Sequence, residues 1–286
     1  LSAHLLCAVL LVADLVGRAF RIQWYLRALG RRIRCRQAFQ LNAWGDAAAG
    51  LTPMRFGGEM AKLAGLLRAG VPTHPGVVAL GLEAAVTYPL VVLFGGWLAW
   101  RFAPAWWQHA RPAVNHAIEA GWPWVIVVGV VTLVGGMLTW YWRRRAPAPV
   151  ADQSASPDTQ GGQPTWPIIA GAALSLFNVV ARTLMLPILA LTLPEHPPFG
   201  VMAFGSFVLL YSQLFLPTPA GAGAVDLGFL SGMAGDLGAG NTTLLVAWRF
   251  YTVGAGALLG LGLAAHHFGV GPAVQAISRL VRRPAP

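Results

Sequence analysis

The sequence predicts an all-α, polytopic membrane protein that contains an inverted-topology repeat with about five spanning helices and two re-entrant helical hairpins. Hydrophobic residues make up 56% of its 286 residues and charged residues only 10%, whereas soluble domains carry about 25% charge. The mean hydropathy is +0.59. Two apolar regions are interrupted by similar motifs that begin at Thr52-Pro53 and Thr218-Pro219. Broken helices of this kind line the substrate path in transporters built from repeats.

Five apolar segments are long enough to cross a hydrocarbon core of about 30 Å. Tryptophans mark both ends of the third segment, as expected for side chains at the two membrane interfaces. The predicted spans run approximately over Leu5–Leu26, Gly76–Trp100, Trp122–Trp142, Trp166–Leu191 and Thr242–His266.

Two further apolar regions, Ala38–Ala69 and Phe199–Leu237, are each broken near the middle by proline and glycine. Neither half of either region is long enough to cross the membrane alone. Each region is therefore expected to form a helical hairpin that enters and leaves on one side, with its irregular backbone shielded by protein.

Arginines cluster after the first, third and last predicted spans. Because cytoplasmic ends of spans are rich in Arg and Lys, these ends are expected in the cytoplasm and the N-terminus outside. Each copy of the repeat then consists of span, hairpin and span, and the third span inverts the second copy. The expected divisions are a first repeat (1–101), an outer surface segment with the connecting span (102–142), a disordered cytoplasmic linker (143–165), a second, inverted repeat (166–268) and a cytoplasmic tail (269–286).

Ionisable side chains at bilayer depth are candidates for function, because each costs at least about 2.5 kcal/mol on insertion scales. Asp14 and Arg18 lie four residues apart, which fits a local ion pair as well as a functional role. Arg182 fits an anion contact or a structural partner for an acid. The ionisable residues in the spans and hairpins are Asp14, Arg18, Asp46, Glu59, Glu83, Arg182, Asp226 and Arg249.

The two breaks are the strongest signals. A helix that restarts after a break presents unpaired amides and the positive end of its dipole, an arrangement that suits phosphate. Glu59 and Asp226 lie just after the breaks, where each could also cap its own helix. A charged residue follows thirty positions after each proline, Glu83 in the first copy and Arg249 in the second, and these two could form an ion pair or a site for a zwitterion. The break residues are Pro53, Gly57, Gly58, Pro219, Gly221 and Gly223.

Two ordered motifs carry a resemblance to a known family. Residues 51–62 (LTPMRFGGEMAK), and residues 216–226 (LPTPAGAGAVD) with 248–251 (WRFY), resemble the signatures of the flippase-like membrane domain of lysylphosphatidylglycerol synthases. Three positions depart from the usual family residues: Ala84 from arginine, Ala220 from glycine and Asp226 from glutamate. The resemblance implies a bacterial inner-membrane protein that moves a lipid or lipid-linked headgroup between leaflets. Lipid synthesis is not expected, because no soluble aminoacyl-transferring domain remains once the spans are assigned.

The leading hypothesis is translocation of a phospholipid or lipid-linked headgroup through a charged groove, without catalytic residues, metal or cofactor. No G-x-x-x-x-G-K-[ST] motif occurs, so direct use of ATP is not expected. The expected partner is a membrane lipid. Nucleic acid is not expected, since no basic soluble face interleaved with aromatic residues is present. The expected substrate-binding residues are Arg55, Glu59, Lys62, Glu83, Arg182, Asp226 and Arg249.

Two alternatives remain open from the sequence. A membrane enzyme acting on lipid phosphates would need a nucleophile or base beside its phosphate site, and the hydroxyls near the breaks are Thr52, Thr218 and Ser231. A non-transporting subunit of a membrane complex, or a homo-oligomer, would use small residues such as those in Gly254–Gly262 for close helix packing.

Overall fold

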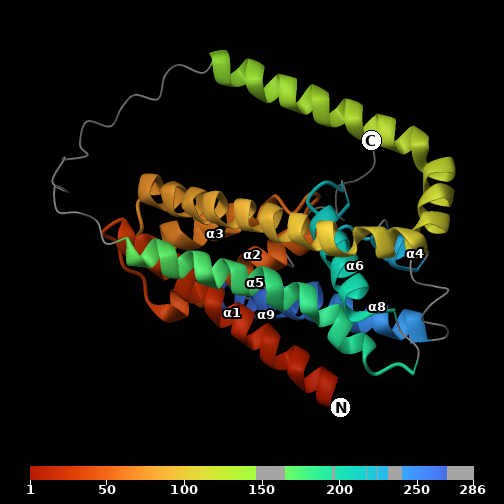
Figure 1. Cartoon of the computed structure of the whole chain (residues 1–286). Coiled ribbons are helices and arrows are strands. Elements are labelled where there is room, and N and C mark those ends of the chain that lie inside the picture. The colour runs from red at the N-terminus through yellow and green to blue at the C-terminus, as the bar shows by residue number, and fades with distance from the viewer. Residues whose placement is uncertain (146–164, 195–196, 217, 224, 231–239, 269–286) are drawn as a thin grey trace, which may run out of the picture.

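The computed structural model describes the backbone of residues 1–145, 165–194, 197–216, 218–223, 225–230 and 240–268, and the side chains in these ranges except 109–110 and 112–145. Over these ranges the chain is helical (Figure 1). In chain order the helices are α1 (Ser2–Ala28), α2 (Cys35–Leu51), α3 (Gly57–Arg68), α4 (Thr73–Arg145), α5 (Trp166–Ala190), α6 (Phe199–Ser212), α8 (Asn241–Arg249), the π-helix η2 (Phe250–Gly254) and α9 (Ala255–Phe268).

Three stretches of the described helices are long and apolar enough to cross a membrane: Thr73–Gln108 of α4, all of α5, and Asn241–His267 across α8, η2 and α9. These agree with the predicted spans that begin at Gly76, Trp166 and Thr242. The protein is therefore an all-helical membrane protein. Helix α1 covers the first predicted span but is less apolar, because it carries Asp14, Arg18, Arg21 and Arg27.

Helix α4 continues beyond the predicted span that ends at Trp100. Its backbone stays helical as far as Arg145, and Figure 1 shows that it turns sharply near its middle. It thus includes the backbone of the outer segment and of the Trp122–Trp142 span. The side chains of the Trp122–Trp142 span lie outside the described residues. Residues 143–145 of the predicted linker at 143–165 continue α4 as helix and are not disordered. Residues 146–164 of the linker and the predicted tail at 269–286 lie outside the described residues.

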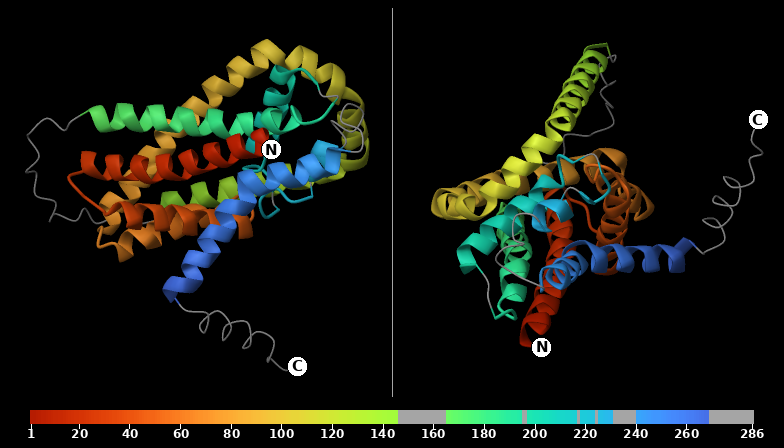
Figure 2. Two further views of the ribbon diagram at one scale, coloured as in Figure 1. Left: turned by 90° about the horizontal axis from the view of Figure 1, so that it is seen from below. Right: turned by 90° about the vertical axis from the view of Figure 1, so that its right-hand side faces the viewer.

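Helices α1 and α5 lie side by side (Figure 2). One apolar cluster, around Cys7, Met185 and Trp248, joins α1 to α5, α6 and α8. A second cluster, around Ile22 and Leu66, joins α1 to α2, α3 and α4. The charged middle of α1 lies between these two clusters, so the packing of both ends holds a polar layer inside the protein.

The first broken region forms a pair of antiparallel helices, α2 and α3, that pack closely through small residues. A Cβ on Gly65 would lie 2.6 Å from the Cβ of Leu41, and a Cβ on Gly58 would lie 3.0 Å from that of Ala49. Side chains at these glycines would force the two helices apart. The region Ala38–Ala69 thus contains two packed helices on either side of the break, and its re-entrant placement stays a prediction.

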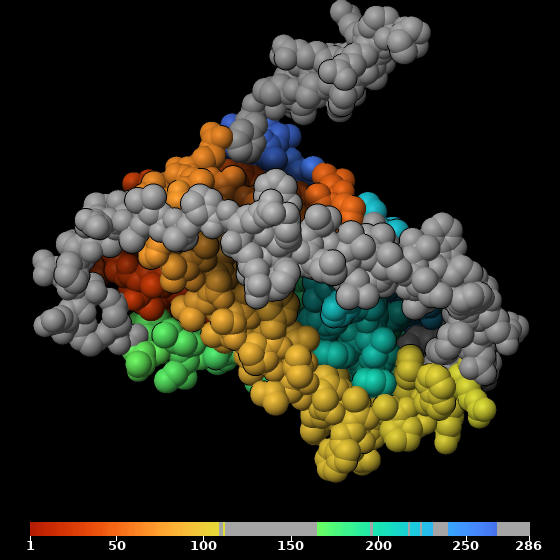
Figure 3. Space-filling view, turned by 90° about the horizontal axis from the view of Figure 1, so that it is seen from above, coloured from red at the N-terminus to blue at the C-terminus, as the bar shows by residue number. Residues whose placement is uncertain are grey.

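The second broken region begins with α6 and restarts as a helical segment at 225–230. In Figure 3 the first part of α4, coloured orange to yellow, runs diagonally between α5 in green and α6 in teal, and it contacts both helices. The two helical breaks and the polar layer of α1 and α5 are thereby brought into one region of the molecule.

Candidate functional site

The two helical breaks meet. Pro53 and Pro219 form an isolated antiparallel β-bridge, and the backbone N–H of Met54 donates to the carbonyl oxygen of Leu216 at 3.3 Å. Residues 166 positions apart in the chain are therefore in direct backbone contact. The tips of the two broken regions form a single junction.

The backbone has the same left-handed conformation at the same two positions after each proline. The φ angles are +50° and +61° at Met54 and Arg55, and +49° and +68° at Ala220 and Gly221. A left-handed conformation costs a residue with a Cβ roughly 1–2 kcal/mol. Such strain persists where the surrounding structure requires it, often at functional sites. Only the second break relieves part of this strain with a glycine.

The helix starts after the breaks are stabilised by side-chain oxygens. The hydroxyl of Thr52 accepts a hydrogen bond from the N–H of Gly57 at 2.9 Å and donates to the carbonyl of Ala48 at 2.8 Å. In the second break the carboxylate of Asp226 accepts from the N–H of Gly223 at 3.1 Å. Asp226 thus does cap its own helix, the alternative role considered for it from the sequence.

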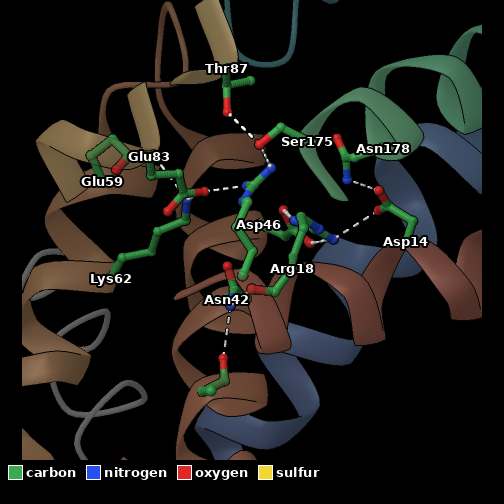
Figure 4. A network of polar contacts seen from close by, with 12 residues as sticks. Asp14, Arg18, Asn42, Asp46, Glu59, Lys62, Glu83, Thr87, Ser175 and Asn178 are labelled. Atoms are coloured by element: carbon green, nitrogen blue, oxygen red, sulfur yellow. Dashed lines mark hydrogen bonds and ion pairs between the residues drawn. The ribbon is translucent and has the colours of Figure 1, made fainter. Parts of the chain in front are cut away.

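A first charged cluster joins α1, α2 and α5 (Figure 4). Arg18 donates two hydrogen bonds of 2.7 Å to the carboxylate of Asp46 and lies 3.2 Å from Asp14. Asp14 also accepts from Arg182 at 3.1 Å and from the amide of Asn178. Asp14 and Arg18 therefore form the expected local pair, within a larger network that includes Arg182.

A second charged cluster lies beside the first and centres on the buried Glu83. Its carboxylate accepts hydrogen bonds from Arg21 and, at 3.1 Å, from Lys62. Lys62 also contacts Glu59 at 3.1 Å. Arg21 donates to the hydroxyl of Ser175 at 3.1 Å. Because buried charges are costly without partners, these contacts make α1, α3, α4 and α5 depend on one another.

Arg249 forms its hydrogen bonds with residues of the second break. It donates to Asp226 at 2.6 Å and to the carbonyl oxygens of Ala220 at 2.9 Å and Gly221 at 3.4 Å. Among the described residues Glu83 pairs with Arg21 and Lys62, so the direct ion pair considered between Glu83 and Arg249 is wrong for this structure. Each residue is neutralised within its own part of the chain.

A cavity of about 680 Å³ opens beside the junction of the breaks. Its interior holds four cationic side chains and two acidic ones. At its edge lie Phe56, Phe215 and Val92, which are 72%, 74% and 71% exposed. The charged residues that line it are Arg18, Asp46, Arg55, Glu59, Lys62 and Arg182.

The predicted site residues therefore belong to two different cavities. Arg55, Glu59, Lys62 and Arg182 line the large cavity, and Glu83 supports it through Lys62. Asp226 and Arg249 instead line a separate cavity of about 480 Å³ on the second break, together with Phe250, Val253 and Gly254 of η2.

Sequence reasoning missed several polar residues of the site, because most of them are neutral and their partners lie on distant helices. One signal was available. Charged residues on α1 recur at positions 14, 18 and 21, and polar residues on α5 at 175, 178 and 182, so each set lies on one helix face. The residues missed are Arg21, Ser175, Asn178, Tyr211 and Gln213.

The chain matches a known protein family. The family described as "Lysylphosphatidylglycerol synthase TM region" matches residues 1–260. No curated protein and no solved structure matches the chain. Because the family match covers most of the sequence and includes both breaks, the chain belongs to the lysylphosphatidylglycerol synthase transmembrane-region family.

Proposed function

We propose that this protein moves a phospholipid or lipid-linked headgroup between the two leaflets of the membrane. The observation that carries the proposal is the cavity of about 680 Å³, which has a charged interior and an apolar edge and lies where the two helical breaks meet.

The composition of the cavity suits a lipid better than a fully polar solute. A charged headgroup needs polar partners to enter the hydrocarbon region, since unpaired polar groups there are costly. Arg55, Arg182 and Lys62 supply donors inside the cavity. The exposed Phe56, Phe215 and Val92 would contact the acyl chains, which could then remain among neighbouring lipids.

We further infer that the protein consists of two inverted halves with re-entrant hairpins, in a bacterial inner membrane with the N-terminus outside. The contact between the breaks and their matching left-handed residues support related halves. Movement of one half against the other would then open the cavity to each leaflet in turn. A second copy or a larger complex remains a candidate partner.

A transport role fits the cavity better than hydrolysis of a lipid phosphate. Among the described residues, the large cavity is lined by no serine, threonine, cysteine or histidine, and the hydroxyls of Thr87 and Thr252, which line a smaller cavity beside it, already make hydrogen bonds inside the protein. Hydrolysis needs a nucleophile or a general base, and the carboxylates of the large cavity, Asp46 and Glu59, are each paired with a cation. The arginines and the lysine can bind an anion without reacting with it. We therefore propose that the protein is not an enzyme.

The test is lipid movement in liposomes that contain the purified full chain. Fluorescent lipid in the outer leaflet is bleached chemically, and the accessible fraction reports movement between leaflets. We expect movement with the wild-type protein and a loss of at least tenfold in rate for Arg55→Gln. Arg111→Gln, which removes an exposed arginine of α4, serves as the matched control and should move lipid normally. Undiminished movement by a variant with both Arg55 and Arg182 neutralised would contradict the proposal.

A further inference from the structure

A smaller cavity of about 130 Å³ lies beside the large one. The two cavities share a wall that contains Arg55, Asn178, Arg182 and Tyr211. At roughly 30 Å³ per water molecule, the smaller cavity has room for about four waters, or for one compact group with several oxygen atoms. The shared wall is therefore a polar inner end beyond the apolar edge of the large cavity.

The charges around this inner end do not balance. Two carboxylates, Asp14 and Asp46, face three guanidinium groups, those of Arg18, Arg55 and Arg182. Among the described residues Arg55 makes no ion pair, and its guanidinium donates a hydrogen bond to a neutral amide oxygen, the Oε1 of Gln213, at 3.3 Å. An excess positive charge that no carboxylate neutralises favours an anion.

Gln213 supplies a second, independent indication. Its side chain is 1% exposed and lines the smaller cavity. Since Oε1 accepts from Arg55, the amide nitrogen Nε2 is left as a donor, and it has no hydrogen-bond partner among the described residues. Buried donors are rarely left without an acceptor. A donor and an unpaired guanidinium that line one small cavity suit the oxygens of a phosphate.

We propose that this inner cavity binds the phosphate of an anionic phospholipid headgroup, held by Arg55, Arg182 and the amide nitrogen of Gln213. The proposal rests on the proposed lipid transport and assigns its substrate class. It also assigns a different role to Arg249, which neutralises Asp226 and bonds to the carbonyls of the second break instead of contacting the phosphate.

The test measures equilibrium binding to the purified full chain in neutral detergent by calorimetry. The probes are dihexanoyl phosphatidylglycerol, inorganic phosphate and dihexanoylglycerol, which has no phosphate. The informative variant is Gln213→Glu, which places a carboxylate beside Arg55 and should therefore preserve the fold. Gln37→Glu makes the same charge change at the start of α2, away from both cavities.

We expect phosphatidylglycerol to bind the wild-type protein and inorganic phosphate to compete with it, while dihexanoylglycerol does not bind. Gln213→Glu and Arg55→Gln should each weaken phosphatidylglycerol binding at least tenfold, and Gln37→Glu should not. Binding to Gln213→Glu within twofold of wild type would overturn the proposal, as would equal binding of dihexanoylglycerol. Binding of inorganic phosphate without phosphatidylglycerol would overturn the assignment to a lipid.

The liposome assay separates this inference from the proposed function. Lipid movement that persists in Gln213→Glu after binding is lost would overturn the role of the phosphate site in transport and leave lipid movement itself standing. Phosphatidylglycerol binding by a wild-type protein that moves no lipid would overturn transport and leave the binding site standing.

Discussion

Arg55 combines two features that oppose stability. Its backbone is left-handed, with a φ of +61°, and its guanidinium lacks a carboxylate partner among the described residues. Glycine tolerates this backbone conformation at no steric cost, and it occupies the equivalent position, Gly221, in the second break. Retention of arginine at position 55 is therefore better explained by binding than by folding.

This contrast gives a prediction for Arg55→Gly. The variant should be at least as stable as the wild type, with a gain of about 1 kcal/mol from the relieved backbone, and it should lose lipid movement. Thermal unfolding in detergent and the liposome assay measure the two effects. Ala220→Gly relieves the same kind of strain without removing a charge. A marked loss of stability in Arg55→Gly alone would show that the arginine supports the fold.

Glu83, in contrast to Arg55, supports the fold, because it neutralises two buried cations. Glu83→Gln leaves Arg21 and Lys62 without their shared carboxylate, and breaking a buried ion pair costs about 3 kcal/mol or more. Glu59→Gln is the control, because Glu59 contacts the same Lys62 but its side chain is 60% exposed, where a pair contributes at most about 1 kcal/mol. Thermal unfolding should show a large loss only for Glu83→Gln, and equal losses would refute this assignment.

At the scale of elements, α9 approaches α2 most closely at Gly260. A Cβ on Gly260 would lie 1.9 Å from the carbonyl oxygen of Ala43, whereas nothing lies within 4 Å of a Cβ on Gly262. The small residues of this stretch are thus used, at least in part, for packing within the chain.

The two glycines make a matched pair for a stability measurement. Gly260→Ala should destabilise the protein, because the helices must separate to admit a methyl group. Gly262→Ala should be neutral or stabilising by up to about 1 kcal/mol, since alanine favours a helix more than glycine does. A similar melting temperature for the two variants would mean that the contact between α2 and α9 is loose.

The sequence predicted elements well where composition alone determines them. The apolar runs predicted α5 and the α8–α9 span to within about two residues, and proline with glycine marked the end of α2 at Leu51. The continuation of α4 past Trp100 was missed, because residues 102–121 were expected to form a separate segment on the outer surface. The partners of Asp14, Arg18 and Arg182 could not be predicted, since they depend on which helices become neighbours.

At the scale of the whole molecule, the contact between Pro53 and Pro219 is where the two broken regions touch. The large cavity lies on the first break and the cavity with Arg249 on the second. If the halves move against each other during transport, this contact has to change. Tying the two tips together should therefore stop lipid movement without altering either cavity.

A disulfide provides this tie. Residues opposite one another in an antiparallel bridge have Cα atoms about 4.5–5.5 Å apart, within the roughly 4.4–6.8 Å that a disulfide spans. We predict that Pro53→Cys with Pro219→Cys, made with Cys35→Ser because Cys35 is exposed, loses lipid movement on oxidation and regains it with reductant. The single cysteine variants should not respond to oxidant. If the oxidised protein moves lipid at the rate of the reduced one, the tips stay together during transport, and the lipid must pass without relative motion of the two halves.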